Sequence, residues 1–310
     1  MTGRILLTGA SGFIGSTALR TLLDLPEPPR VRALTRGARP LPAGVEPVPA
    51  DLARPESLTG VCAGTDVLVH LASHIGSDEE ECHRVNVLGT AALMAEARAS
   101  GVRRVVHLST TAVYGPGPHS GPDVDEVPRR PVSPASRTRL EGEAHALRAG
   151  ALVLRAGLVT GAGDRWVVPA LARLLRDVPG YWDAGRGLIS LIAVEDLGRL
   201  VAAAALGASA TGVQHAVHPE PVRTRDLLDT LADGKVLPAP PRDLTWEESL
   251  VRLKESGSPV SERQFSLLAR DHWYRGDAVW QRCGTAPGPG PLARLAHAAE
   301  WYRSHLTPQG

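Results

Sequence analysis

Short apolar runs alternate with longer stretches of helical periodicity in the first half of the chain. The length and apolar content of these runs predict buried strands over residues 4–9, 31–36, 66–72, 104–109 and 151–156. Between them, apolar residues that recur every three or four positions predict helices over residues 13–25, 81–100 and 135–148. Buried strands separated by helices favour an α/β fold with a doubly wound parallel sheet of the Rossmann type.

The second half of the chain is less regular. Its periodic segments predict helices over residues 166–177, 194–206, 223–231, 246–255 and 261–270. A proline-rich linker over residues 237–243 separates the last two helices from the others. Joined by a Ser-Gly-Ser-Pro turn, these two helices are predicted to form a helical lid within residues 244–271.

This change of pattern predicts two domains. We expect a Rossmann domain in residues 1–155, with contributions from residues 185–215. Residues 156–310 are expected to form mainly a smaller C-terminal substrate domain.

Composition narrows the classes of partner. The chain of 310 residues is 43% hydrophobic and 22% charged, and its net charge of +1 argues against a nucleic-acid partner. No apolar run is long enough to span a bilayer, and the first residues lack the pattern of a signal peptide. The cysteines, Cys62, Cys82 and Cys283, have neither disulfide nor metal-site spacing. We expect a cytoplasmic protein with no metal, membrane or nucleic-acid partner, and the sequence does not indicate its oligomeric state.

The sequence Thr-Gly-Ala-Ser-Gly-Phe-Ile-Gly, residues 8–15, stands between the first predicted strand and the first predicted helix. Its first glycine allows a tight turn, the second lets the backbone approach a pyrophosphate, and the third lets the helix pack closely on the strand. The unpaired N–H groups of the helix N-terminus then face the anion. The pattern predicts a dinucleotide site at Gly9, Ser11, Gly12, Phe13, Ile14 and Gly15.

The end of the second predicted strand indicates which dinucleotide binds. An acidic residue there would bond the ribose hydroxyls of NAD, whereas this chain has Thr35 and Arg36, followed by Arg39. A guanidinium suits the 2′-phosphate of NADP through charge-assisted hydrogen bonds. The alternative is that Arg36 is a solvated loop residue. We expect Arg36 to bind the phosphate and the cofactor to be NADPH/NADP+.

Further motifs follow in order along nearly the whole chain. They are Ala-Asp-Leu at 50–52, His-Leu-Ala-Ser at 70–73, Val-Asn-Val-Leu-Gly-Thr at 85–90, Leu-Ser-Thr-Thr-Ala-Val-Tyr-Gly at 108–115, and the segments 155–164 and 191–201. Together with the glycine turn, this series resembles the extended or atypical short-chain dehydrogenases/reductases. That family includes nucleotide-sugar epimerases and dihydroflavonol reductases.

The resemblance implies a reaction and a set of site residues. In the family, a hydride passes between the nicotinamide and a carbonyl carbon, and a Ser or Thr at the position of Thr110 holds the carbonyl oxygen. A tyrosine in a Tyr-x-x-x-Lys helix gives or takes the hydroxyl proton, and the lysine lowers its pKa. The resemblance implies further cofactor contacts at Asp51, Leu52, Leu71, Ala72 and Ser73.

The tyrosine and the lysine of that family are missing from this chain. Ala135 stands 25 positions after Thr110, which is the family's separation between its Ser/Thr and its Tyr, and Arg139 stands at the Lys position. Ala156 and Ala193 replace a usual Pro and a usual His or Tyr. Arg139 can still bond the ribose hydroxyls and keep positive charge near the nicotinamide, but it cannot act as an acid at neutral pH.

Loss of a positioned general acid removes roughly 10²- to 10⁴-fold of the rate and leaves the effects of positioning and electrostatics. The chain offers other hydroxyl donors, at Thr110, Thr111, Ser73 and Ser136, besides ordered water. Alternatively, the substrate carries the donor, because a ketone beside a phenol has its oxygen hydrogen-bonded internally. Polycyclic aromatic ketones have this arrangement.

All six tryptophans lie in the second half of the chain. Large aromatic side chains there can build the core of a small domain, or they can line a pocket for a flat aromatic substrate. We expect substrate contacts at Thr111, Trp166, Tyr181 and Trp182.

Three functions remain open at this point. The favoured one is an NADPH-dependent ketoreductase of secondary metabolism, such as polyketide antibiotic biosynthesis, that reduces a large polycyclic aromatic ketone of the angucycline type. A non-catalytic NADP(H)-binding regulator or sensor of the same fold is the alternative. A nucleotide-sugar epimerase or dehydratase is the weakest, because those reactions need the tyrosine as a base.

Overall fold

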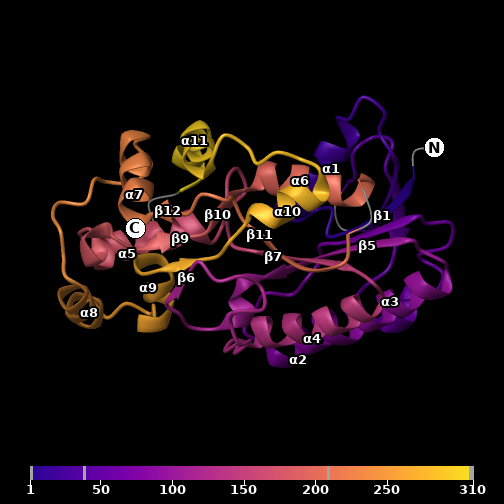
Figure 1. Cartoon of the computed structure of the whole chain (residues 1–310), viewed down its shortest axis with the longest axis horizontal. Coiled ribbons are helices and arrows are strands. Elements are labelled where there is room, and N and C mark those ends of the chain that lie inside the picture. The colour runs from indigo at the N-terminus through magenta and orange to yellow at the C-terminus, as the bar shows by residue number, and fades with distance from the viewer. Residues whose placement is uncertain (1–2, 38–39, 208–209, 307–310) are drawn as a thin grey trace.

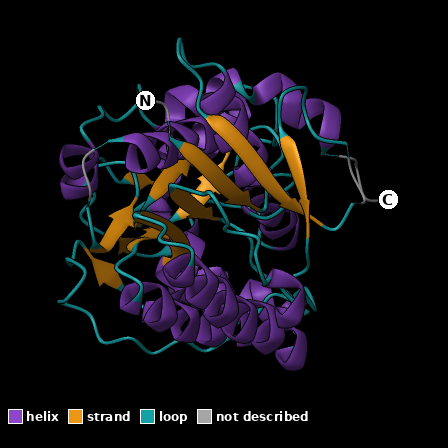
Figure 2. Cartoon of the chain, turned by 90° about the vertical axis from the view of Figure 1, so that its right-hand side faces the viewer, coloured by secondary structure: helices purple, strands orange, loops and turns teal. Residues whose placement is uncertain are grey.

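The computed structural model describes residues 3–37, 40–207 and 210–306. Seven parallel strands form a sheet in the spatial order β11-β7-β5-β4-β1-β2-β3, with helices on both sides (Figure 2). In chain order they are β1 (Arg4–Thr8), β2 (Arg30–Thr35), β3 (Glu46–Pro49), β4 (Val67–His70), β5 (Arg104–Thr110), β7 (Leu152–Ala156) and β11 (Gly212–Ala216). The predicted doubly wound parallel sheet is confirmed.

The strands at the two edges of this sheet, β3 and β11, are ones that the sequence does not predict. β3 contains Pro47 and Pro49, whose missing N–H groups a strand tolerates only where one side is unpaired. β11 pairs only with β7 and contains the polar residues Gln214 and His215. Neither strand has the apolar run that marks the central five.

Both faces of the sheet are buried because successive strand residues point to opposite sides. In β1, Ile5 and Leu7 belong to one hydrophobic cluster and Leu6 belongs to another. The first cluster is covered by α1 (Phe13–Leu23), α6 (Val194–Leu206) and α10 (Asp277–Cys283). The second is covered by α3 (Thr90–Ala99) and α4 (Pro134–Arg148), which lie side by side along the lower edge of Figure 1.

The helix predicted over residues 81–100 is divided into α2 (Glu79–His83), a π-helical turn η2 (Arg84–Gly89) and α3. Asn86 in the π-helical turn donates to the carbonyl of His74 at 2.8 Å and to the hydroxyl of Thr138 at 3.0 Å. It also accepts the N–H of His74 at 2.8 Å. This turn therefore joins the segment after β4 to α4, and π-helical turns are frequent at functional sites.

A further hydrophobic cluster, built mainly from the second half of the chain, lies toward the left of Figure 1. Its helices are α5 (Val167–Asp177), α7 (Thr224–Asp233), α8 (Trp246–Glu255), α9 (Glu262–Ala269), α11 (Pro291–His297) and α12 (Ala299–His305). Four short strands form a sheet in the order β12 (Val222–Arg223), β9 (Leu188–Ile189), β13 (His272–Trp273) and β6 (His119–Ser120). β8 (Leu158–Thr160) pairs with β10 (Leu191–Ala193), and the 3₁₀ turns are η1 (Pro55–Leu58), η3 (Thr111–Tyr114) and η4 (Trp182–Gly185). The predicted domain boundary at residue 155 stays a prediction.

The helix pair α8 and α9 matches the two helices predicted to form a lid. Aromatic contacts fix the pair to the cluster, because the ring of Phe265 lies 5.1 Å from that of Trp182 and is stacked on Trp246 at 5.4 Å. The guanidinium of Arg270 lies over Trp246 at 5.2 Å. The pair is thus anchored in this structure, and its function as a lid stays a prediction.

Three features of the fold bear on membrane, metal and disulfide partners. No helix within the described ranges has the length and apolarity needed to cross a bilayer. Among the same residues, no group of three or more His, Cys, Asp or Glu side chains could hold a metal ion. Cys62, Cys82 and Cys283 are buried and free.

Candidate functional site

The glycine turn has the geometry that a pyrophosphate site needs. Gly9 has φ +76°, and a Cβ there would lie 2.9 Å from the backbone nitrogen of Ala72. A Cβ on Gly15 would lie 1.9 Å from the carbonyl oxygen of Gly9, so only glycine lets α1 pack this closely on β1. Gly12 begins α1 without a side-chain cap, so the first-turn N–H groups can bond an anion, and Ser11 beside it is exposed.

Hydrogen bonds join this turn to the segment after β4. The hydroxyl of Thr8 accepts the N–H of Ala72 at 3.1 Å and shares a hydrogen bond of 2.7 Å with Nδ1 of His70. Nε2 of His70 shares a hydrogen bond of 3.1 Å with the hydroxyl of Thr90. Burial is the main cause that lowers the pKa of His70 to about 4, so the ring is neutral at pH 7. Residues 71–73 are thereby held beside the glycine turn.

The residues predicted to bind the adenosine end lie at neighbouring strand ends. β2 ends at Thr35 and β3 at Pro49, which are register partners, so Arg36 and Asp51 follow adjacent strands. Arg36 is exposed, and Arg39 lies outside the described residues. Asp51 is half-buried and Leu52 is buried. The structure therefore brings the predicted phosphate and adenine contacts to one edge of the sheet.

Thr110, the last residue of β5, has a hydroxyl that can donate. It is half-buried, and its Oγ1 accepts the N–H of Ala112 at 3.2 Å as the N-cap of η3. Because this bond uses a lone pair, it leaves the hydroxyl proton for another acceptor. Thr111 follows directly and is also half-buried.

The start of α4 carries the substituted tyrosine position. Ala135 lies in the first turn of the helix and is half-buried. Ser133 and Ser136 form a capping box, in which the Ser136 hydroxyl donates to the Ser133 carbonyl at 3.1 Å. Since Ser136 is buried and its proton is engaged in the cap, it is not a free donor for a substrate oxygen.

Arg139 is a cation without an acidic partner. Its Nη2 donates to the carbonyl of Leu108 at 3.2 Å, its Nε is buried without a partner, and no described carboxylate forms an ion pair with it. Burial lowers its pKa to about 10, which still keeps the guanidinium charged at neutral pH. His70 and His107 nearby are both neutral, since burial lowers both pKa values. This bond attaches the guanidinium to β5 at Leu108, two residues before Thr110.

A second arginine, Arg155 of β7, is fully paired. Its Nη2 lies 2.6 Å from Oε2 of Glu143 and its Nε lies 3.1 Å from Oε1, and both side chains are 2% exposed. Glu143 also accepts a hydrogen bond from Ser109, the neighbour of Thr110. This buried ion pair therefore ties β5, α4 and β7 together directly behind the site.

Tyr114 belongs to the same buried network. Its hydroxyl accepts Nη1–H of Arg155 at 2.9 Å and lies 2.6 Å from Nε2 of His215. Nδ1 of His215 lies 3.0 Å from the carbonyl of Arg275 and must carry a proton to bond it, so Nε2 accepts the tyrosine proton. Burial lowers the pKa of His215 to about 4, in agreement with a neutral ring. The Tyr114 hydroxyl is thus committed on both sides.

Two of the residues predicted to contact substrate differ sharply in their surroundings. Trp166 precedes α5 and is 61% exposed. A Cβ on Gly163 in the same loop would lie 2.9 Å from the ring of Phe13, so this loop borders the glycine turn. Trp182, in contrast, is fully buried, and its Nε1–H donates to the Val178 carbonyl at 2.8 Å. Trp182 is a core residue that offers no surface to a ligand here.

Tyr181 is half-buried, and its phenol donates to Asp229. The guanidinium of Arg225 lies 3.8 Å from the centre of its ring and also bonds Asp243 of the proline-rich linker. These contacts fix the linker to α7. They do not bring Tyr181 to Thr110.

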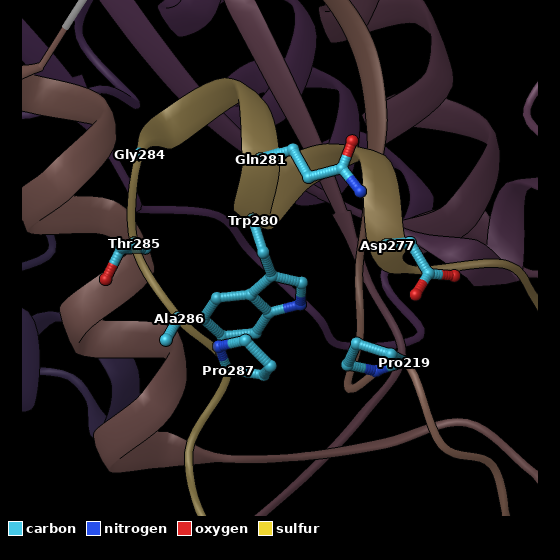
Figure 3. A pocket seen from close by; sticks show the side chains of 8 residues that line it. All are labelled: Pro219, Asp277, Trp280, Gln281, Gly284, Thr285, Ala286 and Pro287. Carbon is cyan, nitrogen blue, oxygen red and sulfur yellow. The ribbon is translucent and has the colours of Figure 1, made fainter.

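A separate surface hollow of about 450 Å³ lies beside α10 (Figure 3). Pro219, Pro287 and the edge of Trp280 line it, with Asp277 and Gln281 above. The indole N–H of Trp280 donates to the Val217 carbonyl at 2.9 Å, and the side chain is buried. None of the predicted site residues lines this hollow.

Sequence reasoning missed the participation of Arg155, His215 and Tyr274 in the surroundings of Thr110. Arg155 and His215 lie in strands where a lone polar residue gives no signal, and Tyr274 lies more than 150 positions away. Glu143 belongs to the motif of the predicted helix, but its pairing with Arg155 is seen only in the three-dimensional structure.

Comparison with known proteins agrees with these features. Residues 5–217 match the model of the NAD dependent epimerase/dehydratase family. A 4-hydroxy-2-methyl-3-oxo-4-farnesyl-3,4-dihydroquinoline-1-oxide ketoreductase of Stigmatella aurantiaca is 29% identical, over 91% of this chain and 92% of that protein. A 2-alkyl-3-oxoalkanoate reductase of Stenotrophomonas maltophilia (strain K279a) is 27% identical, over 92% and 94%.

Among solved structures, MoeE5 in complex with UDP-glucose and NAD is similar with a TM-score of 0.74 and 26% sequence identity. The similarity covers 98% of this chain and 100% of that chain. The whole arrangement of elements is therefore shared, including those outside the residues that the family model matches.

Proposed function

The chain belongs to the NAD dependent epimerase/dehydratase family, and on that basis we propose that it is an NADPH-dependent ketoreductase of secondary metabolism. The observation that carries the proposal is that Arg139, which has no carboxylate partner among the described residues, donates to the Leu108 carbonyl, two residues before Thr110 on the same strand. A hydrogen-bond donor beside a fixed positive charge stabilises the oxyanion that forms when a carbonyl is reduced. Two relatives aligned over more than nine-tenths of the chain carry reductase names.

The residues of the glycine turn fit a dinucleotide. The close approach at Gly9 and Gly15 and the uncapped start of α1 suit a pyrophosphate. Arg36 would bond the 2′-phosphate, and Asp51 the adenine, at the neighbouring ends of β2 and β3. Arg139 would contact the ribose hydroxyls and the oxyanion. When bound, the nicotinamide would supply the hydride.

The proton for the new alcohol would come from the substrate. Ser136 and Tyr114 have their protons engaged in other bonds, so neither replaces the missing tyrosine. Thr110 would hold the carbonyl oxygen, and a phenol beside that carbonyl would give its proton to the alkoxide. This route needs a ketone with a neighbouring hydroxyl on an aromatic ring.

The substrate class that we propose is a large polycyclic aromatic ketone of the angucycline type. Ala135 puts a methyl group where the family has a phenol, which would leave room for a bulky ring system. Trp166 presents an exposed indole on the loop beside the glycine turn, and flat rings stack well on such a surface. In lacking the tyrosine, the chain resembles the angucyclinone 7-ketoreductase of simocyclinone biosynthesis.

A reaction on a nucleotide sugar is disfavoured by the same site. Epimerases and dehydratases of this fold need a base at the position of Ala135. A guanidinium with a pKa of about 10 at Arg139 does not supply one at neutral pH.

The test is NADPH oxidation in the presence of a panel of polycyclic ketones that carry a hydroxyl beside the carbonyl. We expect turnover with at least one angucyclinone, and loss of that turnover when the neighbouring hydroxyl is replaced by hydrogen. Tight NADPH binding without turnover on any ketone of the panel would contradict the proposal and support a regulator.

The choice of cofactor has its own test. Arg36→Glu should weaken NADPH binding by about 10- to 100-fold, the range for a lost hydrogen bond to a charged group. NADH is the control, because it lacks the phosphate: its affinity should not fall, since a carboxylate at this position can bond the ribose hydroxyls. An unchanged NADPH affinity would contradict the assignment of Arg36.

A further inference from the structure

The exposed indole at the start of α5 is held in place by buried contacts. Trp166 is 61% exposed and is the N-cap residue of α5. Asp164, two residues earlier, is buried, and its carboxylate accepts the backbone N–H groups of residues 166, 167 and 168 at 2.7, 2.9 and 3.0 Å. These hydrogen bonds fix the backbone from which the indole projects. A rigid aromatic side chain loses little entropy when a ligand covers it.

The loop that ends at Trp166 is also tied to the C-terminal helix α12. Tyr302 of α12 is fully buried, and its phenol donates to Asp164 at 3.0 Å and accepts the N–H of Gly161 at 2.8 Å. Burial raises the pKa of Tyr302, so the phenol keeps its proton and donates it to the carboxylate. One side chain, 138 positions beyond Asp164, therefore holds the loop at two points.

This loop borders the glycine turn and not the strand that carries Thr110. A Cβ on Gly163 would lie 2.9 Å from the ring of Phe13, the first residue of α1. Thr110 ends β5, and β4 separates β5 from β1 in the sheet. Two strand spacings put the ends of β5 and β1 about 10 Å apart. A ligand that reaches from Thr110 to the Trp166 loop therefore has to be long, such as a system of several fused rings.

We propose that the Trp166 indole is a preformed platform for the substrate rings that lie far from the carbonyl, and that Tyr302 is the positioning residue that holds it. The proposal rests on the ketoreductase function proposed above, and it assigns the selection of large substrates to this loop. The four hydrogen bonds at Asp164 fix the platform before a ligand binds, so less freedom is lost on binding. Stacking on the indole then favours a flat, extended ring system over a two-ring ketone that ends before it reaches the loop.

The test compares two ketones that both carry a hydroxyl beside the carbonyl, a four-ring angucyclinone and the two-ring peri-hydroxytetralone. With the full chain and saturating NADPH, Trp166→Ala should raise the KM of the angucyclinone about 10-fold, as for a lost aromatic contact, and leave its kcat within about twofold. The KM of the tetralone should change by less than about twofold in the same variant. The dissociation constants of both ketones for the NADP+ complex should follow the same pattern, and their measurement needs no turnover.

Tyr302→Phe should act through Trp166 alone. It should raise the KM of the angucyclinone about 3- to 10-fold, the range for the cost of ordering a side chain on binding. In a Trp166→Ala background it should have no further effect, because the platform is already absent. Asp164→Asn keeps the shape of the side chain but replaces one acceptor oxygen with a donor, and it should show the same selectivity for the angucyclinone.

Thr224→Val is the matched control, because it removes a buried hydroxyl whose partners, Gly187 and Leu268, lie outside the loop. The ratio of the two KM values should not change in this variant. Equal rises for both ketones in Tyr302→Phe, or an undiminished rise in the Trp166→Ala background, would show a merely structural contribution and overturn the assignment of Tyr302.

The outcomes also separate this proposal from the ketoreductase function. If the wild type reduces the angucyclinone and Trp166→Ala leaves its KM unchanged, the platform is overturned while the ketoreductase function stands. If the angucyclinone binds without turnover, the ketoreductase function is contradicted, and the dissociation constants of the variants decide on the platform. If neither ketone binds, both proposals fail.

Discussion

Arg155 and Arg139 are two arginines beside the same carboxylate, Glu143, and the protein treats them in opposite ways. Arg155 bonds both oxygens of Glu143, whose hydrogen bonds and charge outweigh burial and raise the pKa of Arg155. Arg139, one helical turn before Glu143 on α4, bonds only a backbone carbonyl, and burial lowers its pKa. One positive charge is paired within the fold, and the other has no carboxylate partner among the described residues.

This difference separates the fold from the chemistry. The Glu143–Arg155 pair holds β5, α4 and β7 in register, and a buried pair of this kind is costly to break. An unpaired cation whose pKa is lowered by burial is unfavourable by itself, and we expect an anionic group of a ligand to offset part of that cost. The surroundings of Arg155 are therefore expected to govern stability, and those of Arg139 to govern activity.

The largest effect should come from breaking the pair. Arg155→Met leaves the Glu143 carboxylate buried with Ser109 as its remaining donor, so the free energy of unfolding should fall by about 3–5 kcal/mol. Arg139→Met is the matched variant, because it removes an arginine without a carboxylate partner from α4, the helix that carries Glu143. It should change the free energy of unfolding by less than about 1 kcal/mol. Urea unfolding of both variants measures the difference.

When each variant is assayed under conditions in which it is folded, Arg139→Met should lose more activity than Arg155→Met. Arg139→Met should lower ketone reduction strongly, because the oxyanion loses its fixed charge. If Arg139→Met destabilises the protein as much as Arg155→Met does, Arg139 is a structural residue and the comparison fails.

Thr110→Val should have the next largest effect. Like Arg139→Met, it should change activity rather than stability. The substitution keeps the volume of the side chain but removes the hydroxyl, so kcat should fall by about 10²- to 10³-fold, as for loss of one oxyanion donor. The free energy of unfolding should change little, because the hydrogen bond that the hydroxyl forms with the described residues is the cap to Ala112 at 3.2 Å. Thr110→Ser should retain most of the rate. Equal rates in Thr110→Val and the wild type would mean that another group holds the oxygen.

The sequence predicts best what depends on neighbours in the chain. The glycine turn is predicted in full, because the conformation of Gly9 and the close packing of Gly15 are local requirements. The helices over residues 194–206 and 246–255 begin and end as predicted, the second because Thr245 and Glu248 form a capping box. The alignment that puts Ala135 and Arg139 at the tyrosine and lysine positions rests on the family's spacing from Thr110, and it stays a prediction.

The sequence does not predict the contacts that depend on long-range packing. The state of Arg139 depends on whether Glu143 prefers it or Arg155, and no local pattern settles that competition. Trp182 stands two residues after Gly180 and looks from the sequence as suited to a pocket as Trp166 does, yet it packs inside the core. Tyr274 stacks on Tyr114, 160 positions away, where β13 pairs with β6.

The smallest predicted effect concerns the pH dependence of the free energy of unfolding. It tests whether the surroundings of Arg139 and Arg155 are equally buried. His70 lies near Arg139 and His215 near Arg155, and burial lowers both pKa values from 6.5 to about 4. The unfolded chain therefore binds more protons between these two values, so the free energy of unfolding is fully present above pH 6.5 and falls as the pH decreases toward 4.

Each histidine should contribute a slope of about 1.4 kcal/mol per pH unit within this window. His70→Gln and His215→Gln should each flatten the curve by about that amount, since a neutral amide does not titrate. Urea unfolding at several pH values between these limits measures the slopes. If His215→Gln flattens the curve and His70→Gln does not, water reaches the surroundings of Arg139 and His70. Arg139 would then be less desolvated than Arg155, and its charge would stabilise an oxyanion less.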